Sequence, residues 1–251
     1  DATWKLYECK DIISKLNNHI NNNFLHRFPG CQPVSIEKLH IKDLTNDKYF
    51  VCEKTDGVRY MFACLVHKNK PYSVLFDRNL NMFLLKTQVQ HKLYEGTLLD
   101  GELVQHNDNS YHYYIFDVLL HNGKNVMKET LLERLTRAHT ICDNIRFCHH
   151  FTLHVKGFLK LNEFDKTKEY PYKTDGLIFT PIHEPIKFGT NYSLYKWKDG
   201  FENTVDFYID ERFQMFLSNN NQLSLTKETI FDEDLLNIHF NFPCIVECKY
   251  R

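Results

Sequence analysis

The sequence predicts an α+β protein, in which antiparallel β-sheets with flanking helices form a core and a small β domain follows. From residue 49 onward, most of the chain consists of short β-branched and aromatic runs separated by turn residues. Apolar residues recur at helical spacing in two segments, residues 4–24 and 128–145. The 20 Phe and 14 Tyr residues are typical of a well-filled, β-rich core.

The elements follow in this order. The helix over residues 4–24 is predicted from Ile12, Leu16 and Ile20 on one face, and an Asn-rich stretch ends it. HRFPGCQPVSI, residues 26–36, is predicted to be an extended loop because its prolines exclude a helix. Strands are predicted at 49–54, 58–67, 72–78, 82–86, 97–105 and 111–120, with a turn at HNDNS, and after the second helix at 151–160 and 176–182.

The composition changes at Asp199-Gly200, a turn signal that predicts a domain boundary near residue 200. Residues 1–200 would form the larger domain and residues 201–251 a small β domain with runs such as TVDFYID and CIVECKYR. The second segment is short for a domain that stands alone. It ends in what resembles the middle of a strand, so we expect an incomplete small barrel or a piece of a longer polypeptide.

Composition and charge narrow the class of protein. The 251 residues are 43% hydrophobic and 25% charged, as in a soluble globular protein, and the formal net charge of −1 gives no global basic field. An anionic partner must therefore meet a local basic patch. The apolar runs are well below the ~20 residues of a membrane span, and the charged start of the chain does not resemble a signal peptide.

The eight cysteines contain no CxxC pair, which favours a reduced, cytosolic protein over a disulfide scaffold. Cys142, Cys148, His149 and His150 lie close together in the sequence and raise the possibility of a metal site. Their spacing matches no structural zinc pattern, so ordinary packing is the favoured interpretation.

Five stretches together carry the residue types that phosphoryl chemistry on a nucleoside triphosphate requires: KTDGVR (54–59), LLDGELV (98–104), YYIFDVL (113–119), KTDGLIF (173–179) and LYKWK (194–198). Such chemistry needs a nucleophile, carboxylates for a metal ion, cations for phosphate oxygens and an aromatic ring for the base. The candidates are Lys54 as nucleophile, Asp56, Glu102 and Asp175 as carboxylates, Arg59, Lys196 and Lys198 as cations, and Phe116 as the ring.

Each stretch taken alone has an ordinary structural explanation. An Asp-Gly pair is commonly a surface turn, Phe116 fits a hydrophobic core, and KWK fits the edge of an amphipathic strand. Alternation along that strand would place Lys196 and Lys198 on one face and Trp197 in the core. The joint presence of all five stretches favours the catalytic interpretation.

Nucleophilic attack by Lys54 requires a neutral amine. At an ordinary lysine pKa of ~10.4, only about one molecule in 2,500 is neutral at pH 7. A bound metal ion, cationic neighbours or desolvation would lower that pKa. Arg59, Lys196 and Lys198 are the cations that the sequence offers.

These stretches resemble the mRNA capping enzyme guanylyltransferases, which belong to the lysine-dependent nucleotidyltransferases together with DNA and RNA ligases. The resemblance covers residues 28–208 and also includes FPGCQPVSI, the helix-forming MKETLLERL and NTVDF. It implies a nucleotidyltransferase core with an OB-fold lid, which uses GTP and Mg²⁺ or Mn²⁺ and transfers GMP to the 5′-diphosphate end of RNA.

The resemblance also implies roles for individual residues. Lys54 would form the covalent adduct with GMP. The other residues would contact the ribose (Arg59, Glu102), stack on guanine (Phe116), lie near its edge (Lys173, Thr174), serve the metal (Asp175, Asp56) or hold the phosphates (Lys196, Lys198).

One departure concerns a basic block that the family carries in the OB domain to orient pyrophosphate. We find no convincing copy, and Arg212 is a poor candidate. The chain would then be the middle part of a larger capping polypeptide, between a triphosphatase and a methyltransferase, as in large cytoplasmic DNA viruses such as African swine fever virus. It would act without a membrane, in the host cytoplasm or virion if viral and in the nucleus if cellular.

Two alternatives stay open. An ATP-dependent polynucleotide ligase would adenylylate the same lysine, although ligases commonly have Glu-Gly where this chain has Asp175-Gly176. A catalytically silent nucleotide- or RNA-binding module would bind GTP without forming an adduct.

Overall fold

The computed structural model describes residues 6–20, 28–165, 167–198, 204–212, 214–219, 222–226 and 243–249 of the chain. The chain divides into two compact units, residues 1–197 and 198–251. Within the described ranges, the helices are too short or too polar to span a bilayer.

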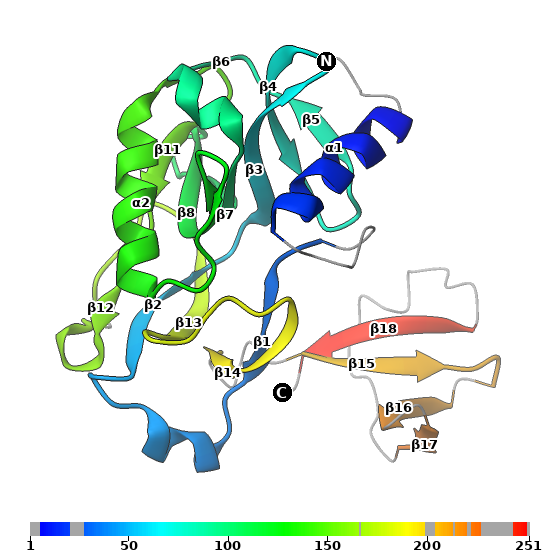
Figure 1. The fold of residues 1–251 in the computed structure, drawn as a ribbon. Coiled ribbons are helices and arrows are strands. Elements are labelled where there is room, and N and C mark those ends of the chain that lie inside the picture. The colour runs from blue at the N-terminus through cyan, green and yellow to red at the C-terminus, as the bar shows by residue number, and fades with distance from the viewer. Residues whose placement is uncertain are drawn as a thin grey trace. The chain divides into compact units, whose positions relative to one another are not determined.

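The first unit is mixed α+β, as predicted, and most of it is sheet (Figure 1). Its elements are α1 (Leu6–His19), β1 (Cys31–Ser35), η1 (Lys38–Asp43), β2 (Tyr49–Thr55), β3 (Val58–His67), β4 (Lys70–Phe76), β5 (Met82–Leu84), β6 (Thr87–Val89), η2 (His91–Glu95), β7 (Thr97–Gln105), β8 (Tyr111–His121), β9 (Lys124–Asn125), α2 (Leu131–Asn144), β10 (Ile145–Cys148), β11 (Thr152–Val155), β12 (Leu159–Lys160), η3 (Leu161–Glu163), β13 (Thr174–Pro181) and β14 (Gly189–Trp197).

The larger sheet has seven strands in the order β11-β8-β7-β3-β4-β5, with β9 beside β8. Its pairs are antiparallel except for β11, which runs parallel to β8. Successive residues of β3 point to opposite faces of the sheet, and both faces are covered. Met61 and Leu65 pack in the cluster that includes Ile12 of α1, whereas Phe62 packs in the cluster that includes Ile141 of α2. Figure 1 shows the two helices against this sheet.

The second helix begins later than predicted because a capping box fixes its start. The Thr130 hydroxyl accepts a hydrogen bond from the Glu133 backbone, and the Thr130 backbone N–H donates to the Glu133 carboxylate at 2.7 Å. The helix therefore covers Leu131–Asn144 rather than residues 128–145. β10 follows directly and pairs with β6 in a two-stranded sheet that the sequence did not predict.

The smaller sheet of the first unit has five strands in the order β1-β14-β13-β2-β12. β1 forms from part of the segment predicted as an extended loop, and it runs parallel to β14. The prediction that Trp197 packs in the core is wrong, since 42% of this residue is exposed. Trp197 is the last residue of β14. At the end of a strand, alternation sets the face to which a side chain points but does not ensure that other residues bury it.

The second unit contains a four-stranded antiparallel sheet in the order β17-β16-β15-β18. Its strands are β15 (Thr204–Ile209), β16 (Met215–Asn219), β17 (Gln222–Leu225) and β18 (Cys244–Lys249). Phe207, Ile209 and Met215 form its small core. Arg212 is exposed in the turn between β15 and β16. The OB-fold-like assignment of this unit stays a prediction.

Six cysteines with described side chains are free thiols: Cys31, Cys52, Cys64, Cys142, Cys148 and Cys244. Within the described part of the chain, Cys142, Cys148, His149 and His150 do not bring three ligand atoms together as a metal ion would require. The structure therefore gives no support to the metal site considered for this stretch.

Candidate active site

A cavity of about 190 Å³ lies between the two large sheets of the first unit. The five-stranded sheet lines it with residues of β2, β13 and β14, and the seven-stranded sheet with residues of β3, β7 and β8. The lining includes four of the predicted site residues, Lys54, Arg59, Glu102 and Phe116. Residues far apart in the sequence thus line one cavity.

The Asp56-Gly57 turn carries the chain from one sheet to the other, because β2 belongs to the smaller sheet and β3 to the larger. A side chain at Gly57 would bring its Cβ within 2.6 Å of the Leu103 carbonyl oxygen, so the turn has room only for glycine. The Gly57 N–H donates to the Glu102 carboxylate at 3.2 Å. Lys54, which precedes the turn on β2, is thereby held at the junction of the sheets.

A β-bulge brings Asp175 beside Lys54. Thr174 pairs with Thr55 and Leu177 pairs with Glu53, so two residues of β13, Asp175 and Gly176, lie opposite the single residue Lys54. Gly176 takes up the irregular backbone with φ of 135°. Lys54 Nζ donates a hydrogen bond to Asp175 Oδ1 at 2.5 Å, and the two side chains are 23% and 18% exposed.

Arg59 is fixed by a forked pair of hydrogen bonds to Asp100. Its Nε and Nη2 donate to the two carboxylate oxygens at 2.9 and 2.5 Å, and its Nη1 donates to the Cys31 carbonyl at 2.6 Å. The guanidinium carbon lies 5.4 Å from the ring centroid of Phe28 and 5.2 Å from that of Phe116. Burial opposes the charge of Arg59, but the Asp100 carboxylate more than offsets it, so the pKa of Arg59 is raised.

Glu102 is a partly buried carboxyl in the cavity wall, where burial disfavours its negative charge. Burial raises the pKa of its carboxyl, although the positive charges of Lys156 and Lys54 and the hydrogen bond from Gly57 act in the opposite direction. A carboxyl with a raised pKa is bound by a proton more readily in the folded than in the unfolded chain. Glu102 therefore links the stability of the fold to pH.

Removing the charge with Glu102→Gln tests this link. Below the ordinary glutamate pKa of ~4.3 the native Glu102 is protonated and neutral in both states, so it destabilises nothing. As the pH rises from that value to the raised pKa of the folded chain, the wild type should lose free energy of unfolding relative to the variant, at about 1.4 kcal/mol for each unit of elevation, and above the raised pKa the loss stays constant. Urea unfolding of both proteins at pH 4.5 and pH 7.5 measures the difference, and an equal difference at both pH values would contradict it.

Lys196 shares a face of the five-stranded sheet with Lys54. Lys196 pairs with Ile178 of β13, and Ile178 pairs with Cys52 of β2, two residues before Lys54. Cross-strand partners point to the same side of a sheet, and so do residues two apart on a strand. Both Ile178 and Cys52 line the cavity. Lys198 is the first residue of the second unit, so the structure gives it no place relative to the cavity.

Three predicted residues are exposed and are not among those that line the cavity: Asp56, Lys173 and Thr174. The Asp56 backbone N–H donates to the Lys173 carbonyl at 3.0 Å, so these residues lie together beside the turn after Lys54. Their metal-binding and base-binding roles stay predictions.

A buried lysine in the cavity wall was missed by the sequence analysis. Lys156 is 5% exposed, its Nζ lies 2.7 Å from the Glu53 carboxylate, and it donates a hydrogen bond to the Thr55 hydroxyl. The Tyr172 hydroxyl donates to Glu53 at 2.6 Å. Glu53 and Thr55 flank Lys54 on β2, so this network fixes the strand that carries the lysine. Asp100 was likewise missed, although it lies two residues before Glu102 on β7.

Several known proteins are similar in sequence to this chain over most of its length. The mRNA-capping enzyme subunit alpha of Schizosaccharomyces pombe is 33% identical over 226 residues, which cover 74% of this chain and 54% of the relative. The same subunit of Saccharomyces cerevisiae is 31% identical over 218 residues, with coverages of 72% and 48%. The mRNA-capping enzyme of Danio rerio is 31% identical over 208 residues, with coverages of 72% and 34%. The chain spans about half the length of the fungal relatives.

A solved structure of mycobacterial DNA ligase D complexed with ATP and MES has a TM-score of 0.48 and 14% identity, and covers 78% of this chain and 70% of the ligase chain. A family model described as "mRNA capping enzyme, catalytic domain" matches residues 5–200. The sequence matches assign the family: this chain belongs to the mRNA capping enzymes, and residues 5–200 correspond to their catalytic domain.

Proposed function

We propose that this chain is an mRNA guanylyltransferase that takes GMP from GTP onto Lys54 and passes it to the 5′-diphosphate end of RNA. Membership of the capping enzyme family supports the proposal. The observation that carries it is the amine of Lys54, which lines a cavity together with Arg59, Glu102 and Phe116 and has Asp175 at 2.5 Å. We infer further that residues 1–200 are the nucleotidyltransferase domain and residues 201–251 an OB-fold-like domain.

The proposed reaction has two displacements at the same phosphorus. In the first, the lone pair of Lys54 Nζ attacks the α-phosphorus of GTP, a P–N bond forms, the P–O bond to the β-phosphate breaks, and pyrophosphate leaves. The neutral amine releases one proton to solvent as the P–N bond forms. In the second, a terminal oxygen of the RNA diphosphate attacks that phosphorus, the P–N bond breaks, and the departing nitrogen takes up a proton, which restores the lysine.

The first displacement requires a neutral Lys54 amine, which in this structure donates a hydrogen bond to the Asp175 carboxylate at 2.5 Å. Asp175, with Asp56 as a second candidate, fits the oxygen ligands that Mg²⁺ or Mn²⁺ takes. A divalent ion bound there would neutralise charge on the phosphate oxygens. The carboxylate of Asp175 would then hold the ion instead of the amine.

The remaining assignments rest on the family resemblance together with the cavity. Arg59 and Glu102 would contact the ribose, and Phe116 would stack on guanine. Lys173 and Thr174 would lie near the edge of the base. Lys196 and Lys198 would hold the phosphates.

Labelling with α-labelled nucleotide tests the proposed activity. The purified chain, incubated with a divalent metal ion and either GTP or ATP, should form an acid-labile adduct with GTP, and peptide mapping should find the label on Lys54. Preferential labelling by ATP would instead support a polynucleotide ligase. Binding of GTP without any adduct, also in a longer form of the protein, would support a silent binding module.

Phe116→Ala should weaken GTP binding by roughly 1–3 kcal/mol, the usual contribution of an aromatic ring that stacks on a base. The matched control is Phe116→Tyr, which keeps the ring and should bind GTP nearly as well as the wild type. Titration calorimetry with GTP measures both variants. Equal affinities of the alanine variant and the wild type would return Phe116 to a purely structural role beside Arg59.

We also propose the acceptor of GMP and the other activities of the full polypeptide. The RNA end is the expected acceptor, and triphosphatase and methyltransferase activities would lie elsewhere in the full polypeptide. The relatives named above come from fungi and a fish, so they add nothing to the expected viral source. A viral origin and a cytoplasmic, virion or nuclear location stay predictions.

A further inference from the structure

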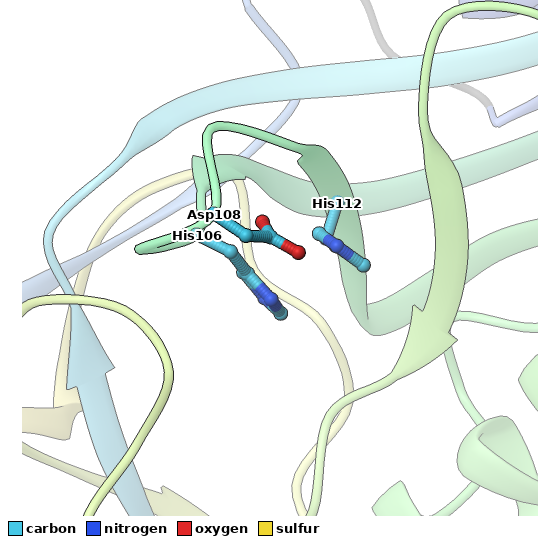
Figure 2. A group of neighbouring side chains, drawn as sticks. All are labelled: His106, Asp108 and His112. Atoms are coloured by element: carbon cyan, nitrogen blue, oxygen red, sulfur yellow. The ribbon is translucent and has the colours of Figure 1, made fainter.

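A group of histidines lies at the turn between β7 and β8, and its members are not among the residues assigned to catalysis. His106, Asp108 and His112 each offer one ligand atom, and these atoms all lie within 4.8 Å of one another. Figure 2 shows the three side chains gathered at the turn, with the carboxylate of Asp108 directed toward His112. We propose that this turn is a binding site for a divalent transition metal ion of the Zn²⁺ type.

The donor set selects the class of ion. Two imidazole nitrogens and one carboxylate suit Zn²⁺ and its neighbours in the first transition row, whereas Mg²⁺ prefers oxygen ligands only. This separates the turn from the Asp175 region, where carboxylates and phosphate oxygens suit Mg²⁺ or Mn²⁺. The two imidazoles are partly buried and Asp108 is exposed, so an ion can reach them from solvent.

The turn is held in shape before any ion binds. The His106 N–H donates to the Ser110 carbonyl at 2.9 Å, and the Asn109 N–H donates to the His106 carbonyl at 2.9 Å. The Asp108 carboxylate accepts from the Ser110 N–H at 2.9 Å. Three ligands within seven residues of one hairpin therefore need little additional ordering, and such preorganisation favours binding.

The outer partners of His112 are those of a metal ligand. His112 Nδ1 lies 2.8 Å from Nε2 of His154, and His112 Nε2 lies 2.8 Å from the Ser110 hydroxyl. A ligating histidine commonly uses its second ring nitrogen in a hydrogen bond that fixes the ring. His154 can take this part while Nε2 of His112 turns from Ser110 to the ion. The Ser110 hydroxyl also forms a hydrogen bond with the Asp108 carboxylate, so Asp108 and His112 already share one partner.

Binding requires one local movement. The rings of His106 and His112 are stacked with centroids 3.5 Å apart and an interplanar angle of 13°, so their lone pairs do not yet converge. Ligand atoms around a tetrahedral ion with bonds of about 2.05 Å lie roughly 3.3 Å apart. His106 must rotate off His112. Because His106 Nε2 also bonds the hydroxyl of Tyr114 at 2.9 Å, and Tyr114 lines the active-site cavity, the ion would share a neighbour with that cavity.

Calorimetric titration of the metal-free chain with ZnCl₂, without nucleotide, tests the proposal. The wild type should bind one equivalent, and His112→Ala and Asp108→Asn should each weaken that binding at least about tenfold. His154→Ala should weaken it as well, since loss of an orienting partner costs 10- to 100-fold in typical sites. Titration with Co²⁺ gives a second readout, because ligand-field absorption of the bound ion should be lost in the same variants.

Two controls separate this site from others in the chain. Asp175→Asn should leave Zn²⁺ binding unchanged, since that carboxylate belongs to the catalytic region. A double variant, His149→Ala with His150→Ala, removes two exposed histidines outside the turn and should also bind like the wild type. Asp108→Asn keeps an oxygen that can accept from Ser110, so its fold should survive, and thermal unfolding without metal checks this. Absence of binding, or equal Zn²⁺ affinities of His112→Ala, Asp108→Asn and the wild type, would overturn the proposal.

Discussion

Replacing Lys54 by alanine is expected to abolish the covalent GMP adduct, with a fall of at least about 10³-fold in the rate of its formation. The reason is chemical: the proposed P–N bond forms at Nζ of Lys54, and among the described residues one other lysine lines the cavity. Lys156, which also lines it, is buried against Glu53 and Thr55. Incubation with α-labelled GTP followed by gel electrophoresis measures the adduct.

The arginine variant makes this test sharper. Lys54→Arg keeps a positive charge that can pair with Asp175, so the fold and the binding of GTP should be largely retained. A guanidinium is not neutral in proteins, so the adduct should still be absent. The matched control is Lys128→Ala, which removes an exposed lysine outside the cavity and should label like the wild type. Adduct formation by Lys54→Arg would refute Lys54 as nucleophile.

Much of the fold could be predicted because its signals are local. The β-branched and aromatic run VRYMFACLVH predicted the strand, and the structure shows why it is apolar almost throughout, since Met61 and Phe62 belong to clusters on opposite faces of the sheet. The capping box at Thr130 was also present in the sequence and would have corrected the start of the second helix. Trp197 was misplaced because alternation describes direction only, whereas burial depends on what lies above the end of a strand.

The candidate site could be predicted in part for a related reason. Lys54, Arg59 and Glu102 lie in short motifs whose residue types are unusual together, so the motifs indicate chemistry before any fold is known. Lys156 directly follows β11 and belongs to no recognisable motif, and its burial against Glu53 depends on a contact between residues 103 apart in the sequence. The partner of Arg59 also depends on the pairing of β3 with β7, although Asp100 stood in the same motif as Glu102.

Replacing Asp100 by alanine should be the most destabilising change near the site, with a loss of about 3–5 kcal/mol in free energy of unfolding. Asp100 and Arg59 are 5% and 12% exposed at their side chains, so the variant leaves a guanidinium without its carboxylate in a place that water barely reaches. The Cys31 carbonyl still accepts from Arg59, but it cannot balance the charge. Urea unfolding followed by far-UV circular dichroism measures the loss.

A paired replacement separates the structural from the functional share of this loss. In Arg59→Met with Asp100→Leu, both charges are gone and apolar side chains of similar size fill the space, so most of the stability should return, as it often does when a buried ion pair is replaced whole. The adduct should not return, because the proposed contact of Arg59 with the ribose is gone. If the paired variant is as unstable as Asp100→Ala, packing rather than charge accounts for the loss. If it is stable and forms the adduct, Arg59 serves the architecture of the cavity and not the nucleotide.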